Sequence, residues 1–315
     1  MNITFRQLRV FCAVYELRSF TAAAQTLHIT QSAVSKLCAE LEHAIGFALF
    51  ERSTRHVNAC DGAADLYAYA QEILGSVRAA QRSLAHLKGL KHGVVAITSS
   101  PMMMHALLGP VIVDFLSHHP GIRFDLHELT TDSSVDYVRT GKVDFGLVSQ
   151  ENEDPKLISE VVYRDPMFVI APSNHELAGK ARIYWKDLTR YHHIALRNAY
   201  SVRRTLDRIL GAKNLRFDSS IETGTLTTGL QLVRAGLGIT VVPGYARDFA
   251  HQLGLSSSII NDKAGYMHEL SLIRRAENKP SIAAAAFIQE LLPALKRMQA
   301  LQMDSLQTGR HTPSH

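Results

Sequence analysis

The pattern of apolar residues changes abruptly at Gly93, and this change constrains the fold more than any other feature of the 315-residue chain. Before Gly93, apolar residues recur at the three- and four-residue spacing of amphipathic helices. After it, short apolar runs that suit β-strands alternate with helical segments, a pattern typical of an α/β domain with a largely parallel sheet. We therefore expect a small helical N-terminal part and a larger α/β part.

The N-terminal part indicates a helix-turn-helix. Two amphipathic helices are expected over residues 5–17 and 20–27, and Thr30 is a good N-cap for a third helix that runs to about Ile45. One face of this third helix is apolar. The other carries short polar side chains and a lysine, which can enter a major groove and hydrogen-bond base edges or phosphates. These residues are Gln31, Ser32, Ser35, Lys36 and Ala39.

Residues 49–57 follow a helix stop at Gly46 and suit a two-stranded wing whose tip carries Arg52 and Arg55. Arginines at such a tip suit contacts to the DNA backbone or minor groove beside the recognition helix. Periodicity alone leaves a second interpretation open, namely a small helical bundle whose polar face is only solvated.

The residues themselves closely resemble the winged helix-turn-helix signature of the LysR-type transcriptional regulators, over about the first sixty residues. The matching segments are Leu8-Arg9-Val10-Phe11, Ser19-Phe20-Thr21-Ala22-Ala23-Ala24, Leu27, Thr30-Gln31-Ser32-Ala33-Val34-Ser35, Leu41-Glu42, Gly46, Leu49-Phe50-Glu51-Arg52 and Arg55-His56-Val57. The resemblance implies sequence-specific binding to double-stranded operator DNA. Its expected DNA contacts are Thr30, Gln31, Ser32, Ser35, Lys36, Arg52 and Arg55.

One position departs from the family pattern. The family places a Leu-Thr pair after its wing, and here Cys60 replaces the threonine that would cap the next helix. Asp61 could take over the capping one residue later. We expect the helix to form, with its starting direction altered.

Residues 61–88 favour a long helix and hold a heptad seam for about three heptads. Such a seam predicts helix-on-helix dimerisation, which agrees with the family resemblance and suits a two-fold-related operator. A solitary helix lying on its own domain is the alternative. The seam residues are Leu66, Ala70, Ile73, Val77, Ala80, Leu84 and Leu87.

The part of the chain after Gly93 resembles the effector-binding domain of the same family. The similarity rests on residues 115–121, on 141–148 and on the stretch from Leu232 to Pro243. It implies two lobes like those of periplasmic binding proteins, joined by crossing strands, with a small molecule between them.

Ligands of open α/β sheets bind beyond the carboxyl ends of strands, where helix N-termini present free N–H groups. Hydroxyls and one arginine stand at such junctions here and would suit a small, anionic metabolite. Each serine or threonine taken singly is better explained as a cap of its helix than as a ligand contact. The candidate effector-binding residues are Ser99, Ser100, Thr130, Thr131, Arg197, Ser201, Thr223 and Thr225.

Motifs of catalysis and of cofactor or metal binding are not found. None of the His-Glu-Leu triplets at His127, His175 and His268 has a second histidine four residues on, so the zinc protease motif is missing. The sequence holds no Gly-x-Ser-x-Gly elbow and no phosphate loop, and Gly236 and Gly238 are followed by Val241 where a dinucleotide motif needs glycine. We expect no enzyme activity, no cofactor and no metal.

Charge and cysteine content agree with this picture without deciding it. The net charge is +5, and residues 1–92 hold ten basic against seven acidic side chains, so the excess lies mostly in the N-terminal part. The three cysteines, Cys12, Cys38 and Cys60, suit a reducing compartment. No apolar run is long enough for a membrane span, and no secretion signal is evident, so we expect a cytoplasmic protein.

The sequence thus predicts a winged helix-turn-helix over residues 1–60, a linker helix and hinge over 61–92, and an effector domain over 93–302. Its first lobe should take residues 93–164 and 267–302, its second lobe 165–266, and residues 303–315 should be a disordered tail. The expected assembly is a homodimer or a dimer of dimers that also contacts RNA polymerase. A small-molecule-binding module or an α/β enzyme without a DNA-regulatory role are the alternatives.

Overall fold

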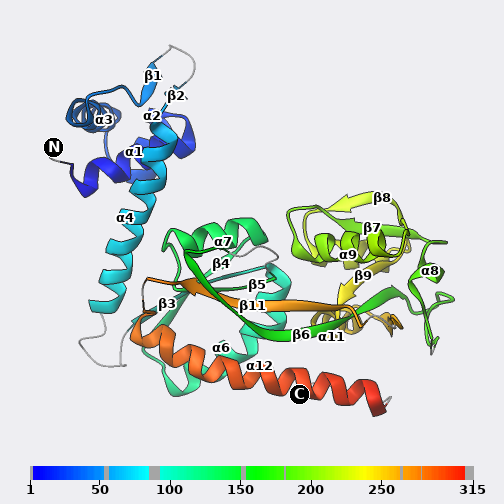
Figure 1. Cartoon of the computed structure of the whole chain (residues 1–315). Helices are drawn as coiled ribbons and strands as arrows, with labels where there is room; N and C mark the ends of the chain where they lie inside the picture. The colour runs from blue at the N-terminus through cyan, green and yellow to red at the C-terminus, as the bar shows by residue number, and fades with distance from the viewer. Residues whose placement is uncertain are drawn as a thin grey trace. The chain divides into compact units, whose positions relative to one another are not determined.

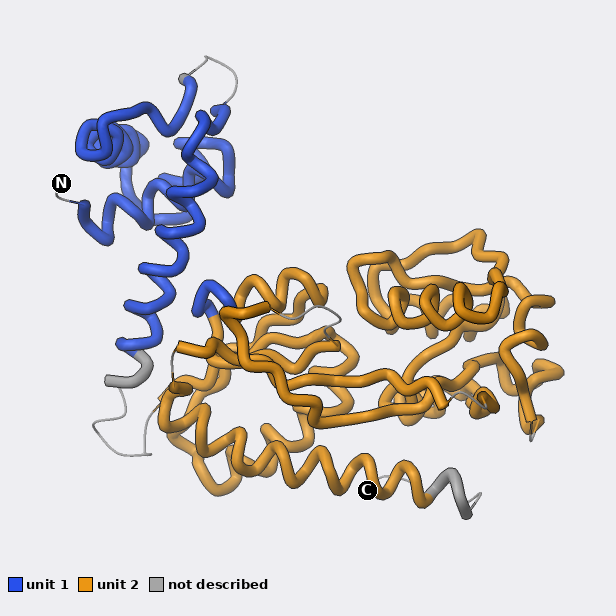
Figure 2. The backbone as a smooth tube through the Cα atoms, in the orientation of Figure 1, with its two compact units in different colours: residues 1–84, 139–142 blue, residues 85–138, 143–315 orange. Residues whose placement is uncertain are grey.

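The computed structural model describes residues 3–52, 57–84, 93–149, 154–180, 182–262, 265–277 and 279–308. The chain divides into two compact units (Figure 2), one of residues 1–84 with 139–142 and one of residues 85–138 with 143–315. Each unit is described by itself below, with the element labels of Figure 1.

Three short helices build the first unit: α1 (Phe5–Leu17), α2 (Phe20–Leu27) and α3 (Gln31–Ile45). Each begins after a hydroxyl residue whose side chain accepts a hydrogen bond from a backbone N–H of the first turn, as expected of N-caps. Each ends at a residue in the left-handed backbone region. The caps are Thr4, Ser19 and Thr30, and the end residues are Arg18, His28 and Gly46.

The wing is confirmed as a short antiparallel hairpin of β1 (Phe50–Arg52) and β2 (Val57–Ala59), in which Phe50 pairs with Ala59. The ring of Phe50 lies 5.7 Å from that of Phe11, which is fully buried at the centre of the helices. This contact anchors the wing to the same core that holds the recognition helix.

The linker helix α4 (Ala63–Leu84) begins two residues later than the sequence suggests, after a turn in which Gly62 has a φ of 83°. Its first turns are part of the first unit. The ring of Tyr67 stacks on that of Tyr15 at 4.4 Å, and Gln71 Nε2 donates to Glu16 Oε1 at 2.8 Å. The helix therefore forms despite Cys60, and its N-terminal half is fixed to α1.

The second unit begins with a parallel β-α-β arrangement. Strand β3 (Gly93–Ser99) lies between β4 (Ile122–Glu128) and β5 (Phe145–Val148) and pairs parallel with both. The connection from β3 to β4 is the helical run α5 (Pro101–Met103), a π-helical turn (Met104–Leu108) and α6 (Gly109–His118). Helix α7 (Thr131–Arg139) links β4 to β5.

The π-helical turn has a local cause. Pro110 lies at the start of α6 and has no N–H to continue the α-helical hydrogen-bond ladder. The preceding Gly109 N–H instead donates five residues back to the carbonyl oxygen of Met104.

Two long strands cross from the first half of this unit to the second, as Figure 1 shows: β6 (Leu157–Pro172) and β11 (Met267–Arg275), which pair antiparallel. Beyond Pro166, β6 leaves β11 and pairs with β9 (Thr240–Pro243) and β10 (Leu255–Ile259). We call the half with β3, β4 and β5 lobe I, and the half with β7 to β10 lobe II. The expectation of a largely parallel sheet is corrected, because the crossing strands and their neighbours pair antiparallel.

Lobe II adds a small parallel pair, β7 (His192–Leu196) and β8 (Asp218–Thr223). Its helical segments follow one another along the chain between the strands that build this lobe. They are α8 (Trp185–Leu188), α9 (Ser201–Ala212), α10 (Leu226–Arg234), the 3₁₀ turn Gly244–Ala246 and α11 (Arg247–Gln252).

Helix α12 (Ile282–Thr308) closes the chain and packs on lobe I through Phe287, whose ring lies 5.2 Å from Phe115 and 5.0 Å from Phe124. The prediction of a disordered tail from residue 303 is wrong as far as Thr308, since the helix continues to that point. Near its end, Gln302 Nε2 donates to Asp165 Oδ1 at 2.7 Å, and Gln299 Oε1 accepts from the backbone of Arg164. These bonds to β6 explain why the helix extends further than its apolar pattern predicts.

Candidate functional site

The polar face of α3 is exposed as a unit. Thr30, Gln31, Ser32 and Lys36 are all exposed and Ser35 is half-buried, whereas Val34, Cys38 and Leu41 on the opposite face are fully buried. Burial of that apolar stripe against α1 fixes the rotation of α3, so the polar face points away from the core. The structure thus brings the five expected helix residues onto one surface.

Hydrogen bonds and an ion pair within this face orient its side chains and still leave their polar groups accessible. Thr30 Oγ1 lies 3.0 Å from Ser32 Oγ, and Gln31 Nε2 donates to Ser35 Oγ at 3.5 Å. Lys36 reaches Glu40 at 4.0 Å, with 78% of its side chain exposed. Exposed amide, hydroxyl and ammonium groups in the first turns of a helix are the groups that contact bases and phosphates.

The side chains of the two wing arginines, Arg52 and Arg55, lie outside the described residues. Arg52 ends β1, where its backbone pairs with Val57, and Arg55 falls among the undescribed residues. Their DNA contacts stay a prediction.

The heptad seam is divided between two roles. Ala70 is fully buried and Leu66 packs partly buried in the core of the first unit, so Ala70 is corrected from a dimer contact to a core residue. Ile73 is 44% exposed and Tyr69 66% exposed. Val77 is half-buried and Ala80 exposed, while the side chains of Leu84 and Leu87 lie outside the described residues. The apolar face that α4 leaves open is thus offset from the predicted seam and includes Tyr69.

Three of the eight candidate effector residues are helix caps. Ser100 Oγ accepts from Met103 N at 3.4 Å, Thr130 Oγ1 from Ser133 N at 3.4 Å, and Thr225 Oγ1 from Thr228 N at 3.2 Å. Two others bond within their own lobe: Ser99 Oγ donates to the Leu147 carbonyl at 2.7 Å, and Thr223 Oγ1 donates to the Thr225 carbonyl at 3.1 Å. These five hydroxyls therefore have structural partners.

Thr131 and Ser201 meet across the two lobes. Ser201 is the first residue of α9, and its N–H donates to Thr131 Oγ1 at 3.3 Å; both residues are buried. The N-cap residue of α9, Tyr200, gives no side-chain hydrogen bond, so this helix start takes an acceptor from the opposite lobe. Arg197 is exposed; its backbone N–H donates to the carbonyl of Thr223, and its carbonyl accepts from the N–H of Tyr200.

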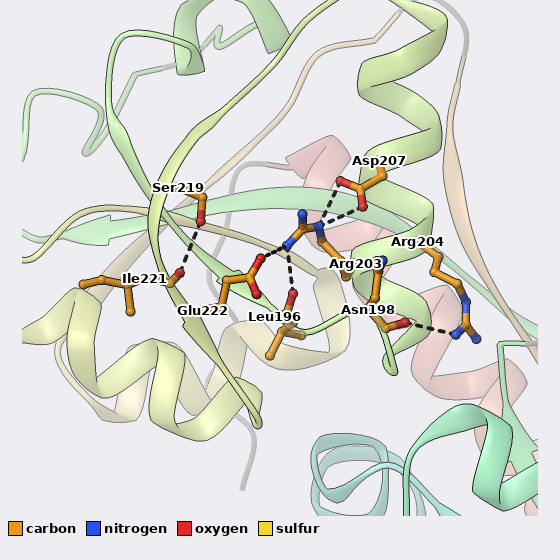
Figure 3. Close-up of polar contacts among 8 residues, drawn as sticks. All are labelled: Leu196, Asn198, Arg203, Arg204, Asp207, Ser219, Ile221 and Glu222. Carbon is orange, nitrogen blue, oxygen red and sulfur yellow. Dashed lines mark hydrogen bonds and ion pairs between the residues drawn. The ribbon is translucent and has the colours of Figure 1, made fainter.

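Sequence reasoning missed a second contact between the lobes. Arg204 on α9 lies 3.3 Å from Asp132 on α7, and it also donates to the carbonyl of Asn198 at 3.1 Å (Figure 3). The two partners lie 72 residues apart, and the sequence carries no signal that would have paired them.

The crossing strands hold two buried ionisable groups side by side, since His268 of β11 pairs with Asp165 of β6. Burial lowers the pKa of His268 to about 3, so its ring is neutral. His268 Nδ1 lies 3.3 Å from Thr205 Oγ1 on α9. Burial raises the pKa of Asp165 to about 7, against the opposing effect of hydrogen bonds from Tyr245 and Gln302.

Among the described residues, no group of three His, Cys, Asp or Glu side chains is placed to hold a metal ion. The same residues form no helix that is long and apolar enough to cross a membrane.

Comparison with known proteins identifies both parts of the chain. Residues 5–61 match the family model described as "Bacterial regulatory helix-turn-helix protein, lysR family", and residues 88–296 match the "LysR substrate binding domain". The chain therefore belongs to the LysR family of transcriptional regulators, and it is a DNA-binding regulator with an effector-binding domain.

Individual relatives span nearly the whole chain. The RuBisCO operon transcriptional regulator of Allochromatium vinosum is 28% identical over 300 residues, which cover 95% of this chain and 98% of that protein. The structure of full-length CbnR complexed with its target DNA has a TM-score of 0.67 at 20% identity, covering 93% of this chain and all of that one. The effector-binding domain of QuiR in complex with shikimate has a TM-score of 0.59 at 19% identity, covering 65% of this chain and 98% of that domain.

Proposed function

We propose that this chain binds operator DNA as a homo-oligomer and changes its hold on that DNA when a small anionic metabolite binds between the lobes of its C-terminal domain. The observation that carries the DNA-binding half is the exposed polar face of α3, whose orientation is set by the buried stripe of Val34, Cys38 and Leu41. CbnR, a structural neighbour, was solved with its target DNA, which supports the same role here.

Within this proposal, Gln31 and Ser35 contact base edges and Lys36 contacts a phosphate. Thr30 and Ser32 take part at the start of the helix, and the wing adds Arg52 and Arg55. A bidentate side-chain contact to a base is worth about 1–3 kcal/mol of discrimination, while a phosphate contact adds affinity without sequence preference.

The assembly is proposed to be a dimer through the exposed apolar face of α4, with two dimers joining through effector domains into a tetramer. Tyr69 and Ile73 lie four residues apart on that face and are both exposed. A symmetric dimer presents its two heads to a two-fold-related operator.

The effector half of the proposal rests on the meeting of α7 and α9 across the lobes at Thr131 and Ser201. A metabolite that prefers one lobe arrangement shifts the population of conformations, and so alters how the operator is held and how RNA polymerase is recruited. The QuiR effector domain was solved with shikimate, a carboxylate, which supports a small anionic ligand for this chain. The role is regulatory rather than catalytic, and as a DNA-binding regulator the chain acts in the cytoplasm.

The DNA-binding half is tested by selecting duplexes from a random library with the full-length protein and measuring affinity for the selected sequence and for a scrambled one. We expect a clear preference that falls with rising salt. Equal affinity for both duplexes would reject sequence-specific binding. The effector half is tested by a thermal-shift screen of small metabolites, followed by footprinting with the best hit.

A further inference from the structure

Besides the crossing strands and the apolar core that the two lobes share, polar contacts join the starts of two helices across the lobes. The acceptors come from the first turn of α7 in lobe I: Thr131 Oγ1 and the carboxylate of Asp132. The donors come from α9 in lobe II: the N–H of Ser201 and the guanidinium of Arg204. Lobe I thus offers oxygen atoms and lobe II offers positively polarised groups.

A carboxylate ligand would offer lobe II the same pattern. Its two oxygen atoms can accept from a helix N-terminus and from an arginine together, because both groups favour negative charge. In the structure this pattern is supplied by two neighbouring side chains of α7, Thr131 and Asp132. The side chain of Arg204 is 27% exposed and that of Asp132 75% exposed, so an incoming anion can reach the pair from solvent.

The preceding arginine shows what a purely structural pairing looks like. Arg203 donates to Asp207 at 2.8 and 2.9 Å, to Glu222 at 3.1 Å and to the carbonyl of Leu196 at 3.1 Å (Figure 3). All of these partners lie in lobe II. The adjacent Arg204 instead has its carboxylate partner in the other lobe, at longer distances of 3.3 and 3.4 Å.

We propose that Arg204 is the group that recognises the anionic part of the effector, and that Asp132 occupies it in the effector-free protein as a displaceable internal substitute. This inference rests on the proposed effector-binding function and adds the residue and ligand class to it. The effector's anionic group replaces the carboxylate of Asp132 on Arg204, and its second oxygen replaces Thr131 Oγ1 on the Ser201 N–H. Binding therefore releases the contact between α7 and α9.

This competition sets the apparent affinity for the effector, because only the fraction of molecules with Arg204 released can bind. A partly exposed ion pair of this kind changes an equilibrium by about two- to fivefold. Removing the Asp132 charge should tighten anion binding by that factor.

The contact between the lobes is tested first by hydrogen exchange of the full-length protein, measured by mass spectrometry. Asp132→Asn and Arg204→Gln should each raise exchange about two- to fivefold in peptides over residues 130–138 and 198–206, and the double variant should raise it no further. Asp207→Asn is the matched control, because it removes a carboxylate next to an α9 arginine within lobe II, and it should leave peptide 130–138 unchanged. Unchanged exchange in that peptide in both single variants would overturn the proposal.

The anion specificity is tested with acetate as the probe, against chloride at equal ionic strength. In Asp132→Asn, acetate should restore protection of residues 198–206 and chloride should not, because acetate takes the place of the missing carboxylate. The double variant with Arg204→Gln should not respond. An equal response to both salts, or an acetate response that survives loss of Arg204, would contradict the assignment.

These results are separable from the proposed function itself. Duplex DNA binding by the same samples depends on the first unit, so a protein that binds no specific duplex yet shows the acetate response rejects only the regulatory role. A protein that binds its duplex but shows no acetate response in Asp132→Asn rejects only the role of Arg204.

Discussion

The N–H of Ser201 donates a hydrogen bond to Thr131 Oγ1 at 3.3 Å, which joins the start of α9 in lobe II to the start of α7 in lobe I. Neither group has an equivalent partner within its own lobe among the hydrogen bonds of the described residues. The starts of α7 and α9 therefore satisfy each other's polar groups across the two lobes.

Thr131→Val should remove this contact while preserving side-chain shape. The effector-free protein should then exchange the amides of residues 198–206 faster, because the Ser201 N–H loses its acceptor. Hydrogen exchange measures this directly. Thr130→Val is the matched control: it removes the cap of α7 and should act on residues 130–138 only, and an identical pattern for both variants would refute the distinct role of Thr131.

The cap of α10 should contribute to stability by the amount usual for a helix N-cap. Thr225→Ala removes the acceptor of the Thr228 N–H and is expected to lower the free energy of unfolding by about 1 kcal/mol, whereas Thr225→Asp should retain most of it. Urea unfolding followed by circular dichroism gives both values. A neutral Thr225→Ala would contradict a stabilising role for this cap.

Asp165 should make the stability of the second unit depend on pH. Burial raises its pKa from 3.8 to about 7, so the folded protein retains a proton that the unfolded chain has lost. Its contribution to stability is complete below about pH 4 and is lost as pH rises to about 7. The groups that surround Asp165 are Tyr163, Tyr245, Arg247, Gln302 and His268. His268 and His193 are neutral in the folded protein above about pH 4 but gain a proton in the unfolded chain below about pH 6.5, so their contributions to stability rise with pH across the same window and oppose that of Asp165.

The measurement is the free energy of unfolding in urea at a series of pH values between about 5 and about 8, for the wild type and Asp165→Asn. The unfolding free energy of the wild type minus that of Asp165→Asn should fall as pH rises from about 5 to about 7, because the contributions of the histidines are common to both proteins. A variant with the same slope as the wild type would show that another group is responsible.

Gly244 permits the approach of α12 to the crossing strand. A Cβ at this position would overlap Gln302 Nε2 and Asp165 Oδ1. Gly244→Ala should therefore destabilise the second unit by about 1–3 kcal/mol, and combining it with Gln302→Ala should recover part of the loss because the longer side chain is gone. Thermal unfolding of the two single variants and the double variant tests this, and a fully additive loss would contradict the steric explanation.

The dimer contact should lie on the exposed face of α4. Ile73→Asp is expected to weaken self-association at least tenfold, because it places a charge on an apolar interface. Ala68→Asp is the matched control, since Ala68 is also exposed but faces elsewhere on the helix. Sedimentation velocity over a range of protein concentrations distinguishes them, and equal behaviour of both variants would reject this face.

The sequence predicted the structural features that depend on local interactions, and it missed those that depend on residues far apart in the chain. The recognition helix follows from a local cap at Thr30 and a local apolar stripe, and its exposed face was predicted residue by residue. The continuation of α12 to Thr308 was not, because it depends on Gln302 contacting Asp165, 137 residues away. The pairing of Asp132 with Arg204 was missed for the same reason. The start of β6 gives no continuous apolar signal, because the four residues after Leu157 are all exposed.

The seam of α4 shows a different kind of limit. Heptad spacing identifies one apolar stripe, but the spacing does not indicate which part of the protein packs against that stripe. Leu66 and Ala70 are covered by α1 and its neighbours, and the remaining open face shifts toward Tyr69. The stacking of Tyr67 on Tyr15 and the hydrogen bonds of Tyr67 and Gln71 to Glu16 fix that rotation.

The most direct test of the central claim is fluorescence anisotropy of the full-length protein with the duplex chosen by selection, compared with a scrambled duplex. Gln31→Ala and Ser35→Ala should each reduce the ratio of the two affinities about fivefold or more while leaving the scrambled affinity unchanged. Lys36→Ala should lower both affinities together. If all three variants bind both duplexes as the wild type does, the polar face of α3 is not the DNA-reading surface and the account is wrong.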